Sequence, residues 1–546
     1  MNQRRYNIYF HTHTISGIII AALLYVIFFA GSFSFFRDDI SAWQKGKSVA
    51  NQKLDADYNY LLDSLGEKYN TKGRNFDFYV LRQGHGTYVN MSTSQDTTIS
   101  KPKPKEERKG RRRGRDKDGD SAYFLHYFTD KSQSSYDEGY DMGEFLYRLH
   151  FLAQVNYIPI RIGTPFGYLL AGIVSFLFLF ALITGLFLHW DKIKSNFFIF
   201  RPWSKWKTVW TDMHTALGVI GFPFQFVFAV TGVILIVNFV LISPFSKLLY
   251  EGDQDKLYRD LQYTRGAEVA YTYNPMQKDF DLNAFVASWQ QKWGKSQVTR
   301  VYIRNYMDES MEVILESTPF SQTSFAGSGY TRVQIATGKI VEEKSPYTDG
   351  NHIDRVKSLI YHLHFGDFGG KPLRIVFFVL GLMGCVVIIS GIMIWLVARD
   401  KVNVPAYKRK FNFWAANFFL SMCLAMLPVT AFTFIVVKVL PTVNMTVIFS
   451  AYFYSWLVLT IYLMLWRNLT VVNKHVLLLS AILCFAVPVA NGIVTNLWFW
   501  NAITVRAFDI LFIDMLFLVL SVCSVLGFIK VRKDGKEFKI LKTQKS

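Results

Sequence analysis

The chain has 546 residues, of which 51% are hydrophobic and only 18% are charged. A soluble protein carries about 25% charged residues, so this composition excludes a purely soluble enzyme. The apolar runs are also longer than the short alternating strands of an outer-membrane barrel. The net charge of +19 comes mostly from short segments between apolar runs, so membrane topology explains it better than nucleic-acid binding does. We predict a polytopic α-helical membrane protein that binds no nucleic acid.

Eight apolar runs are long enough to cross a bilayer, which takes about 20 helical residues. They lie at residues 14–36, 166–190, 215–240, 372–397, 412–437, 446–466, 475–497 and 506–529. Lys and Arg gather before the first run, between the second and third, after the fourth, between the sixth and seventh, and after the eighth. With eight spans, all these segments fall on one side of the membrane. Because basic loops stay inside, we predict that both termini are cytoplasmic.

Two long loops, residues 37–148 and 241–360, would then lie outside, and each has the pattern of a small α+β domain. In the first loop we predict a helix at 58–69 and strands near 76–82, 88–94 and 122–128. In the second we predict a helix at 282–293 and strands at 298–306, 311–318 and 330–341. A basic tract inserted at 101–118 is too polar to bury a core, so we expect a disordered, solvated segment. Contact with anionic lipid or an acidic partner is the alternative.

The predicted organisation therefore has seven parts along the chain. They are a first spanning segment at 1–36, an outer domain at 37–148, a His-bearing segment with spans two and three at 149–240, a second outer domain at 241–360, a His-bearing segment with span four at 361–397, spans five to eight at 398–530, and a basic cytoplasmic tail at 531–546. Span eight carries Arg506, Asp509 and Asp514. A buried carboxylate there could pair with an arginine, relay protons or bind a cation.

The first four spans contain an internal repeat. Span one has His13, Gly17 and Gly31, and span three has His214, Gly218 and Gly232, both in the pattern H-x3-G-x13-G. Span two is preceded by Leu149-His150-Phe151 and ends near Thr184-Gly185, while span four is preceded by Leu363-His364-Phe365 and ends near Ser390-Gly391. Each half therefore runs span, outer loop, His-bearing segment, span.

The spacing of this motif suits a flat metal-bearing ring. In a helix His13 and Gly17 share a face, and Gly31 lies about five turns further along the same stripe, near the opposite membrane surface. The imidazole can reach a metal, and the missing side chain one turn away leaves room for a macrocycle. The same holds for His214, Gly218 and Gly232.

Paired imidazoles from facing helices are a natural axial set for haem iron. His13 and His214 lie at the inner ends of their spans, and His150 and His364 lie on the outer side, so we predict two haems, one near each membrane face. Interfacial or capping histidines and simple helix packing through small residues remain alternatives. A zinc or iron site is another, although no acidic or Cys ligands accompany these histidines. His189, His362 and His11 are weaker ligand candidates.

These motifs resemble the PepSY-associated transmembrane-helix family. The resemblance covers about residues 1–400 and rests on the H-x3-G spans, on Thr231-Gly232, on Leu363-His364-Phe365-Gly366 and on Ser390-Gly391-Ile-Met-Ile-Trp395. The segment Val333-Gln-Ile-Ala-Thr-Gly338 is similar to a PepSY strand-turn-strand. The chain departs from the family at Ala30-Gly31, where Thr-Gly is usual, in the basic insertion, and in spans five to eight, which occur in only some members.

The resemblance implies a bacterial inner-membrane protein with two b-type haems and two PepSY-like outer domains. It implies electron transfer from the cytoplasmic side or a quinol to a ferric siderophore or other ferric chelate in the periplasm, and thus ferric-chelate reductase activity in iron uptake. No GxGxxG or flavin motif is evident, so the donor should be a separate molecule. Weak candidates for receiving the anionic chelate are Arg148, Arg161, Arg355 and Arg374. The alternatives are a transporter or permease for iron chelates and a PepSY regulatory or scaffold protein without redox activity.

Overall fold

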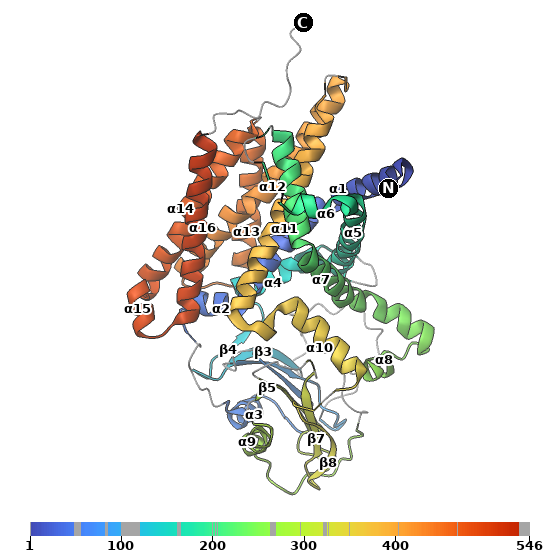
Figure 1. The fold of residues 1–546 in the computed structure, drawn as a ribbon. Helices are drawn as coiled ribbons and strands as arrows, with labels where there is room; N and C mark the ends of the chain where they lie inside the picture. Colours follow the sequence, from blue (N-terminus) through green and yellow to red (C-terminus); the bar gives the residue numbers. More distant parts are fainter. Residues whose placement is uncertain are drawn as a thin grey trace. The chain divides into compact units, whose positions relative to one another are not determined.

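The computed structural model describes most of the chain and divides it into two compact units (Figure 1). The described residues are 2–48, 56–81, 86–99, 121–160, 165–198, 200–201, 204, 206–261, 269–294, 296–319, 325, 327–348, 350–401, 403–466 and 468–533. The basic insertion predicted at 101–118 and almost all of the predicted tail at 531–546 lie outside them, so those two predictions stay untested.

The first unit consists of residues 1–50, 141–240 and 363–546, and it is helical. Eight helices are long and apolar enough to cross a membrane, and they overlap all eight predicted spans. They are α1 (Gln3–Ser34), α5 (Phe166–His189), α7 (Trp206–Leu249), α11 (Gly370–Arg399), α12 (Ala406–Val439), α13 (Met445–Leu465), α14 (Leu469–Thr495) and α16 (Phe508–Lys533). Shorter helices are α2 (Arg37–Lys45), α4 (Met142–His150), α6 (Ile193–Phe198) and α15 (Phe499–Thr504). The prediction of a multi-pass helical membrane protein is confirmed.

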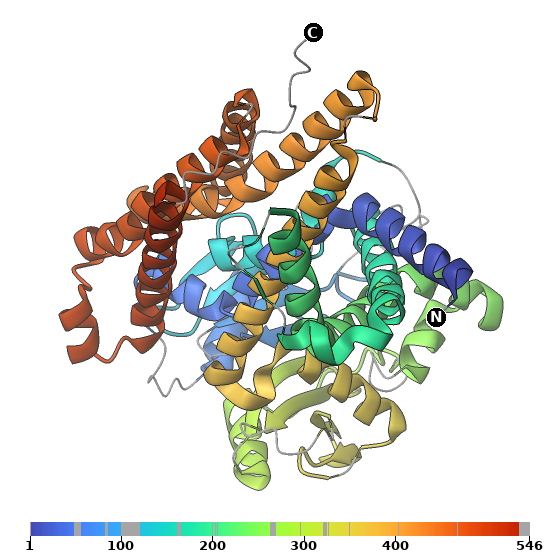
Figure 2. The same ribbon diagram turned by 45° about the horizontal axis from the view of Figure 1, so that its top comes forward.

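Two groups of helices make up this unit. Helix α1 packs against α4, α5 and α11. In the C-terminal part α14 packs between α12 and α16, and α13 packs against α12; these helices lie together in orange and red in Figure 2. Most of the spanning helices are less than half buried against other helices. An apolar surface on the remaining sides is what contact with lipid requires of a membrane span.

A buried polar cluster ties α2 to the C-terminal helices. The Asp514 carboxylate, on a residue only 4% exposed, accepts hydrogen bonds from the Trp43 indole at 2.7 Å and from the Asn491 amide at 2.8 Å. The Lys438 ammonium donates to the Trp43 carbonyl. Because a buried carboxylate needs such donors, the cluster explains an acidic residue in an apolar helix. Within the part of the chain that the structure describes, the hydrogen-bond donors to the Asp514 carboxylate are thus Trp43 and Asn491 and not an arginine.

The second unit, residues 51–140 and 241–362, is built on one eight-stranded antiparallel sheet. The strands are β1 (Phe76–Val80), β2 (Gly86–Met91), β3 (Ala122–Tyr127), β4 (Gln133–Ser135), β5 (Ser296–Arg304), β6 (Glu312–Pro319), β7 (Gly329–Gln334) and β8 (Lys339–Lys344), in the order β4-β3-β2-β1-β5-β6-β7-β8. The helices of this unit are α3 (Tyr58–Gly66), α8 (Gln254–Asp260), α9 (Leu282–Trp293) and most of α10 (His352–Phe365).

The two loops therefore do not form separate domains, which corrects the boundaries expected at 37–148 and 241–360. Strand β1 of the first loop pairs with β5 of the second, with Phe76 opposite Ile303 and Phe78 opposite Val301. All four of these side chains are fully buried in the core beneath α3 and α9. Asp77 lies between Phe76 and Phe78 and faces the other side of the sheet. Its carboxylate accepts two hydrogen bonds from Arg300, at 2.7 and 2.9 Å. Apolar burial and this bidentate ion pair together join the two halves of the sheet.

Helices α3 and α9 are held together at their N-termini by a reciprocal set of hydrogen bonds, which we call the Asn clasp. The Asn59 amide oxygen accepts from Leu282 N at 2.9 Å, and the Asn283 amide oxygen accepts from Tyr58 N at 2.7 Å. The Asn283 amide donates to Asp57 and the Asn59 amide donates to Asp281, and these two aspartates cap α3 and α9. Each helix thus satisfies exposed N–H groups of the other.

The strand predictions hold with two differences. The short strand β4 was not predicted, and the segment predicted as one strand at 330–341 is two, β7 and β8. The chain turns between them at Thr337-Gly338, where Gly338 has φ +70°. Glycine adopts this left-handed conformation without steric cost.

Candidate functional site

Four histidines of the first unit come together as two pairs. His13 of α1 and His214 of α7 have ring centroids 6.1 Å apart, and His150 of α4 and His364 of α10 have ring centroids 5.8 Å apart. The members of each pair come from different halves of the sequence repeat. The pairs formed are the ones that the motif positions predict.

Each of the four rings uses its Nδ1 atom in a hydrogen bond to a neighbouring helix. His13 contacts the carbonyl oxygen of Ala181 at 2.9 Å, His214 that of Val387 at 2.9 Å and His150 that of Ile27 at 2.8 Å. His364 contacts the Thr231 hydroxyl at 2.8 Å. A carbonyl can only accept, so in three rings Nδ1 carries the proton and Nε2 is left as a lone-pair donor. This is the usual arrangement of a metal-binding histidine.

A glycine on the neighbouring helix lies under each ring. A Cβ added at Gly185 would lie 3.0 Å from His13, one at Gly391 3.2 Å from His214, and one at Gly31 2.4 Å from His150. At Gly232 the distance to His364 would be 3.9 Å. Gly185, Gly391 and Gly31 each lie four residues after the residue whose carbonyl contacts the same ring. Gly232 directly follows Thr231, whose hydroxyl contacts His364.

This arrangement changes the role predicted for Gly31 and Gly232. We expected both to lie on one stripe with the histidine of their own helix, near the opposite membrane surface, and to take part in cofactor binding. In the structure a Cβ at Gly31 of α1 would meet His150, and Gly232 of α7 lies beside His364. The small residue makes room for the imidazole of the opposite pair. The sequence motif therefore contains one histidine together with a glycine that the histidine of the other pair packs against.

Gly17 and Gly218 differ from the other four glycines. A Cβ at either position would meet no protein atom within 4 Å. Each lies one turn from its histidine, His13 or His214, on the same face of its helix. The described residues therefore leave open space beside the inner pair, where the motif spacing predicts a macrocycle.

Helix α4 is fixed by α2, and this fixes His150. Asp141 caps α4 and contacts Ser41 and Lys45 of α2. Burial opposes ionisation of Asp141, yet Lys45 and the Ser41 hydrogen bond hold its pKa below the usual value. Glu144 pairs with Arg37 of α2. A Cβ at Gly143 would lie 2.3 Å from the Arg37 carbonyl oxygen, so the two helices cross in close contact.

Burial keeps the outer pair neutral. It lowers the pKa of His364 to about 3, with the neighbouring His150 contributing, and it lowers the pKa of His150 although the Ile27 carbonyl opposes the shift. Both imidazoles are therefore uncharged at neutral pH. Only a neutral imidazole has the lone pair that binds a metal.

The donor set fits an iron porphyrin better than a metal ion held by protein alone. Two imidazoles on opposite sides of one metal, with bonds of about 2 Å and about 1 Å from nitrogen to ring centre, put ring centroids about 6 Å apart. Both pairs match this spacing. Among the described residues no group of three or more His, Cys, Asp or Glu is placed to hold a metal ion. Two axial imidazoles are sufficient when a macrocycle supplies the other ligands.

A family model described as the PepSY-associated TM region matches residues 10–398. The chain belongs to this family. The match takes in both loops, the first four spans and all four paired histidines, and it ends before α12. A search of curated proteins finds no match.

The weaker ligand candidates of this PepSY-associated protein belong to neither ring pair, although His189 interacts electrostatically with His214. His11 is exposed beside Phe10, His189 ends α5, and His362 contacts Phe325 in the second unit with the two rings tilted. Arg148 pairs with Glu144 within α4. Of the other predicted arginines, Arg355 lies in the second unit, Arg374 lies in α11, and Arg161 is outside the described residues.

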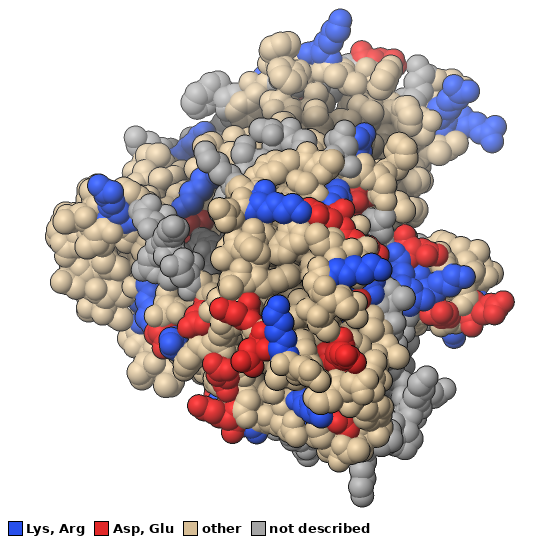
Figure 3. Space-filling view, turned by 90° about the horizontal axis from the view of Figure 1, so that it is seen from below, with Lys and Arg blue, Asp and Glu red and all other residues tan. Residues whose placement is uncertain are grey.

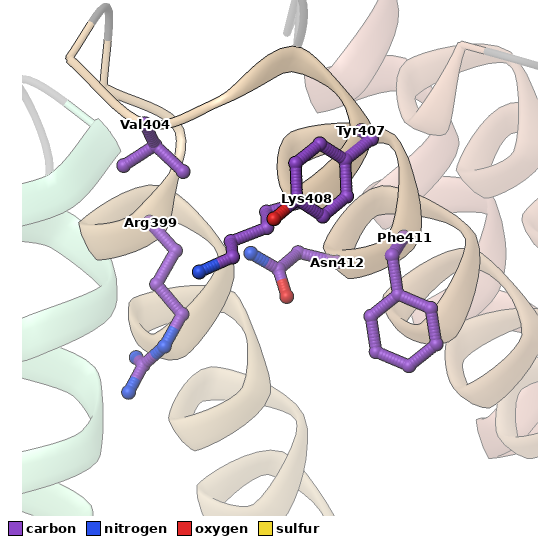
Figure 4. Close-up of a pocket in the computed structure, with 6 residues that line it drawn as sticks. All are labelled: Arg399, Val404, Tyr407, Lys408, Phe411 and Asn412. Atoms are coloured by element: carbon purple, nitrogen blue, oxygen red, sulfur yellow. The ribbon is translucent and has the colours of Figure 1, made fainter.

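A separate hollow of about 560 Å³ lies where α11 ends and α12 begins (Figure 4). It is lined by Arg399, Val404, Tyr407, Lys408, Phe411 and Asn412. Basic and aromatic side chains together are typical of the end of a span at headgroup level. The hollow contains none of the predicted site residues.

The face shown in Figure 3 does not single out a docking site for an anionic chelate. On this face acidic and basic side chains of the described residues are interspersed. Electrostatic steering of an anionic ligand needs a basic surface.

Proposed function

We propose that this PepSY-associated protein is a di-haem electron carrier that passes electrons across the membrane to a ferric chelate. The single observation that carries the proposal is the pair of histidine pairs, each with the Nδ1 atoms held by neighbouring helices. One pair can hold one b-type haem through Nε2, since the chain has no CxxCH motif for covalent attachment. A haem supplies reversible one-electron chemistry when bound.

The chain's own residues have distinct tasks in this proposal. His13 and His214 would hold one haem near one membrane face, and His150 and His364 would hold the other near the opposite face. The carbonyls of Ala181, Val387 and Ile27 and the Thr231 hydroxyl fix the ring orientations. Gly185, Gly391, Gly31 and Gly232 let the rings approach the facing helices. Gly17 and Gly218 leave space beside the inner pair.

The direction of electron flow follows from the predicted topology. With the basic short loops inside, the His13–His214 pair would lie near the cytoplasm and the His150–His364 pair near the periplasm of a bacterial inner membrane. Electrons from a quinol or a cytoplasmic reductase would enter at the inner pair. At the outer face one electron converts Fe(III) of a siderophore or other chelate to Fe(II), which the chelator holds more weakly. The sheet unit, as a PepSY-like domain, would receive the chelate.

The redox proposal is favoured over a permease or a scaffold by where the histidines lie. A permease is expected to bind its substrate near the midplane between repeats, whereas these pairs lie near the ends of the spans. A scaffold needs no paired neutral imidazoles with prearranged tautomers.

The proposal is tested first by haem content. Purified full-length protein should be red and carry about two haems per chain, one per histidine pair. His214→Ala and His13→Ala should each lose one haem and keep the other. His475→Ala is the matched control, because His475 also lies near a span end but contacts Tyr462 and Trp466. Unchanged haem content in both His13→Ala and His214→Ala would falsify the ligand assignment.

The ferric part needs its own measurement. Dithionite-reduced protein should be reoxidised by candidate ferric chelates, followed through its absorption bands. Reoxidation no faster than in a ferric-free control would remove iron as the acceptor and leave the haem assignment intact.

A further inference from the structure

One of the four paired histidines has a different hydrogen-bond partner. Three rings contact a backbone carbonyl, and His364 contacts the side-chain hydroxyl of Thr231 at 2.8 Å. Thr231 directly precedes Gly232. The residues that precede the other three glycines are Ala30 before Gly31, Thr184 before Gly185 and Ser390 before Gly391. Three of the four positions thus carry a hydroxyl, but in only one is that hydroxyl the ring's closest partner.

The neighbouring contacts explain this difference. The Thr184 hydroxyl donates to the carbonyls of Phe180 and Ala181, at 2.8 and 3.0 Å, and His13 bonds to the Ala181 carbonyl itself. The Ser390 hydroxyl is 3.4 Å from His214 Nδ1, further than the Val387 carbonyl at 2.9 Å. Thr184 and Ser390 therefore lie beside their ring contacts without replacing the carbonyl.

The Thr231 hydroxyl is an acceptor toward His364. Its own proton is directed to the Val227 carbonyl, 2.6 Å away, which can only accept. The oxygen lone pairs are then free to accept Nδ1–H from His364. This assignment leaves Nε2 of His364 without a proton, as an axial ligand requires.

The acceptor at Nδ1 changes how strongly an imidazole donates to a metal. A good acceptor draws the Nδ1 proton away, makes the ring more basic and stabilises the ferric state. A hydroxyl oxygen is a weaker acceptor than an amide carbonyl. Both histidines of the inner pair use carbonyls, whereas the outer pair combines one carbonyl with one hydroxyl.

We infer that Thr231 is a positioning residue that gives the His150–His364 site a higher reduction potential than the His13–His214 site. The inference rests on the proposed function. Hydrogen bonds to axial ligands are one of the levers by which a protein sets haem potential. With the higher potential outside, an electron that enters at the inner pair comes to rest at the outer pair, next to the acceptor.

The test is a potentiometric titration of purified full-length protein after its haem content has been measured. His214→Ala and His364→Ala identify which midpoint belongs to which site. The outer midpoint should be the higher one in the wild type. Thr231→Val removes the acceptor with little change in shape. It should shift the electron distribution between the sites about tenfold further toward the outer one, or about 59 mV for a one-electron couple.

Two variants separate this effect from a general disturbance of the helices. Thr184→Val makes the same chemical change where the ring bonds to a carbonyl, and it should leave both midpoints in place. Thr231→Ser keeps a hydroxyl and should behave as the wild type.

An outer midpoint equal to or below the inner one in the wild type would overturn the inference. So would unchanged midpoints in Thr231→Val with both haems retained. If Thr231→Val loses its outer haem, the order of the two midpoints in the wild type decides whether the inference stands. A protein that binds no haem at all would instead defeat the proposed function, so the two failures are distinguishable.

Discussion

Glycine positions decide where the four imidazoles lie. A ring can reach a carbonyl inside a neighbouring helix only if no side chain stands between them, and Gly185, Gly391 and Gly31 meet that need. The same carbonyls then orient the rings. Local sequence thus sets both the distance and the tautomer of a ligand that comes from another helix.

We predict opposite outcomes for alanine at Gly31 and at Gly17. Gly31→Ala would place a methyl group where the His150 ring lies, 2.4 Å from its Nδ1, so His150 must move and the outer haem should be lost. Gly17→Ala meets no protein atom, so protein packing should be unaffected. The haem stoichiometry and the thermal unfolding of each purified variant measure these effects.

The same pair of variants tests what occupies the space beside the inner pair. If a haem lies there, Gly17→Ala should weaken inner haem binding while leaving the stability of the haem-free protein unchanged. Full retention of both haems in Gly31→Ala would contradict the proposed contact with His150.

At this scale the sequence predicts the four histidines and their pairing, but not their glycine partners. Helical spacing puts His13 and Gly17 on one face, since both are on one helix. Spacing alone cannot relate Gly31 to His150, because that contact depends on how α4 packs against α1. The Thr231 hydrogen bond was missed for the same reason.

At the scale of the elements, the Asn clasp is formed by one short sequence pattern that occurs at the start of two helices, and it was not predicted. Residues 57–59 and 281–283 both have the pattern Asp-x-Asn at the start of a helix. Each Asp caps its own helix, and each Asn bonds across to the other helix. The caps could be predicted from the sequence, but the crossing bonds could not, because two spanning helices separate α3 from α9.

The clasp predicts acid sensitivity of the sheet unit. Hydrogen bonds from Asn283 and Tyr60 lower the pKa of Asp57, and hydrogen bonds from Ala284 and Asn59 lower the pKa of Asp281. A folded-state pKa below the unfolded one stabilises the fold above about pH 4, and this contribution is lost as the pH falls through the folded pKa. Hydrogen exchange at the starts of α3 and α9, corrected for intrinsic rates, should therefore accelerate below about pH 4.

The double variant Asp57→Asn, Asp281→Asn is the control for this effect. Asparagine still caps a helix but does not titrate in this range. The acid-dependent part of the acceleration should disappear in the double variant. If wild type and variant accelerate equally, other carboxyl groups are responsible.

Strand prediction succeeded where the pattern is local and failed where it is not. Alternation of buried and exposed residues located β1, β3, β5 and β6. Strand β4 has only three residues and no apolar pattern, so nothing in the sequence marks it. The β1–β5 pairing depends on two segments that lie on opposite sides of α5 and α7 in the chain, and no local signal indicates that they meet.

At the scale of the whole molecule, the pairing of β1 with β5 constrains topology. Strands can pair only if both loops lie on the same side of the bilayer, so α5 and α7 must cross it an even number of times between them. This agrees with eight spans. The basic segment between α11 and α12, which borders the hollow in Figure 4, is expected on the cytoplasmic side, because basic short loops stay inside.

Cysteine labelling tests this topology. Cys385, Cys423 and Cys484 are buried, so only Cys523 needs replacement by Ser to reduce the background. With an impermeant maleimide, Lys401→Cys should label only from the cytoplasmic side of sealed vesicles, because basic short loops stay inside. Lys339→Cys, in the exposed strand β8, should label only from the opposite side. Labelling of both positions from one side would contradict the eight-span arrangement.

The shared sheet has a consequence for biosynthesis. When the first loop emerges from the membrane, β1 has an unpaired edge, and it stays unpaired until α5 and α7 have been inserted and β5 has crossed. Unpaired strand edges are prone to join the wrong chain, and pairing over long sequence separations is slow. If the helices of a chain insert in the wrong orientation, β5 remains on the wrong side of the membrane. The edge of β1 then stays unpaired. Completion of the sheet thus distinguishes correctly inserted chains from those that proteases should remove.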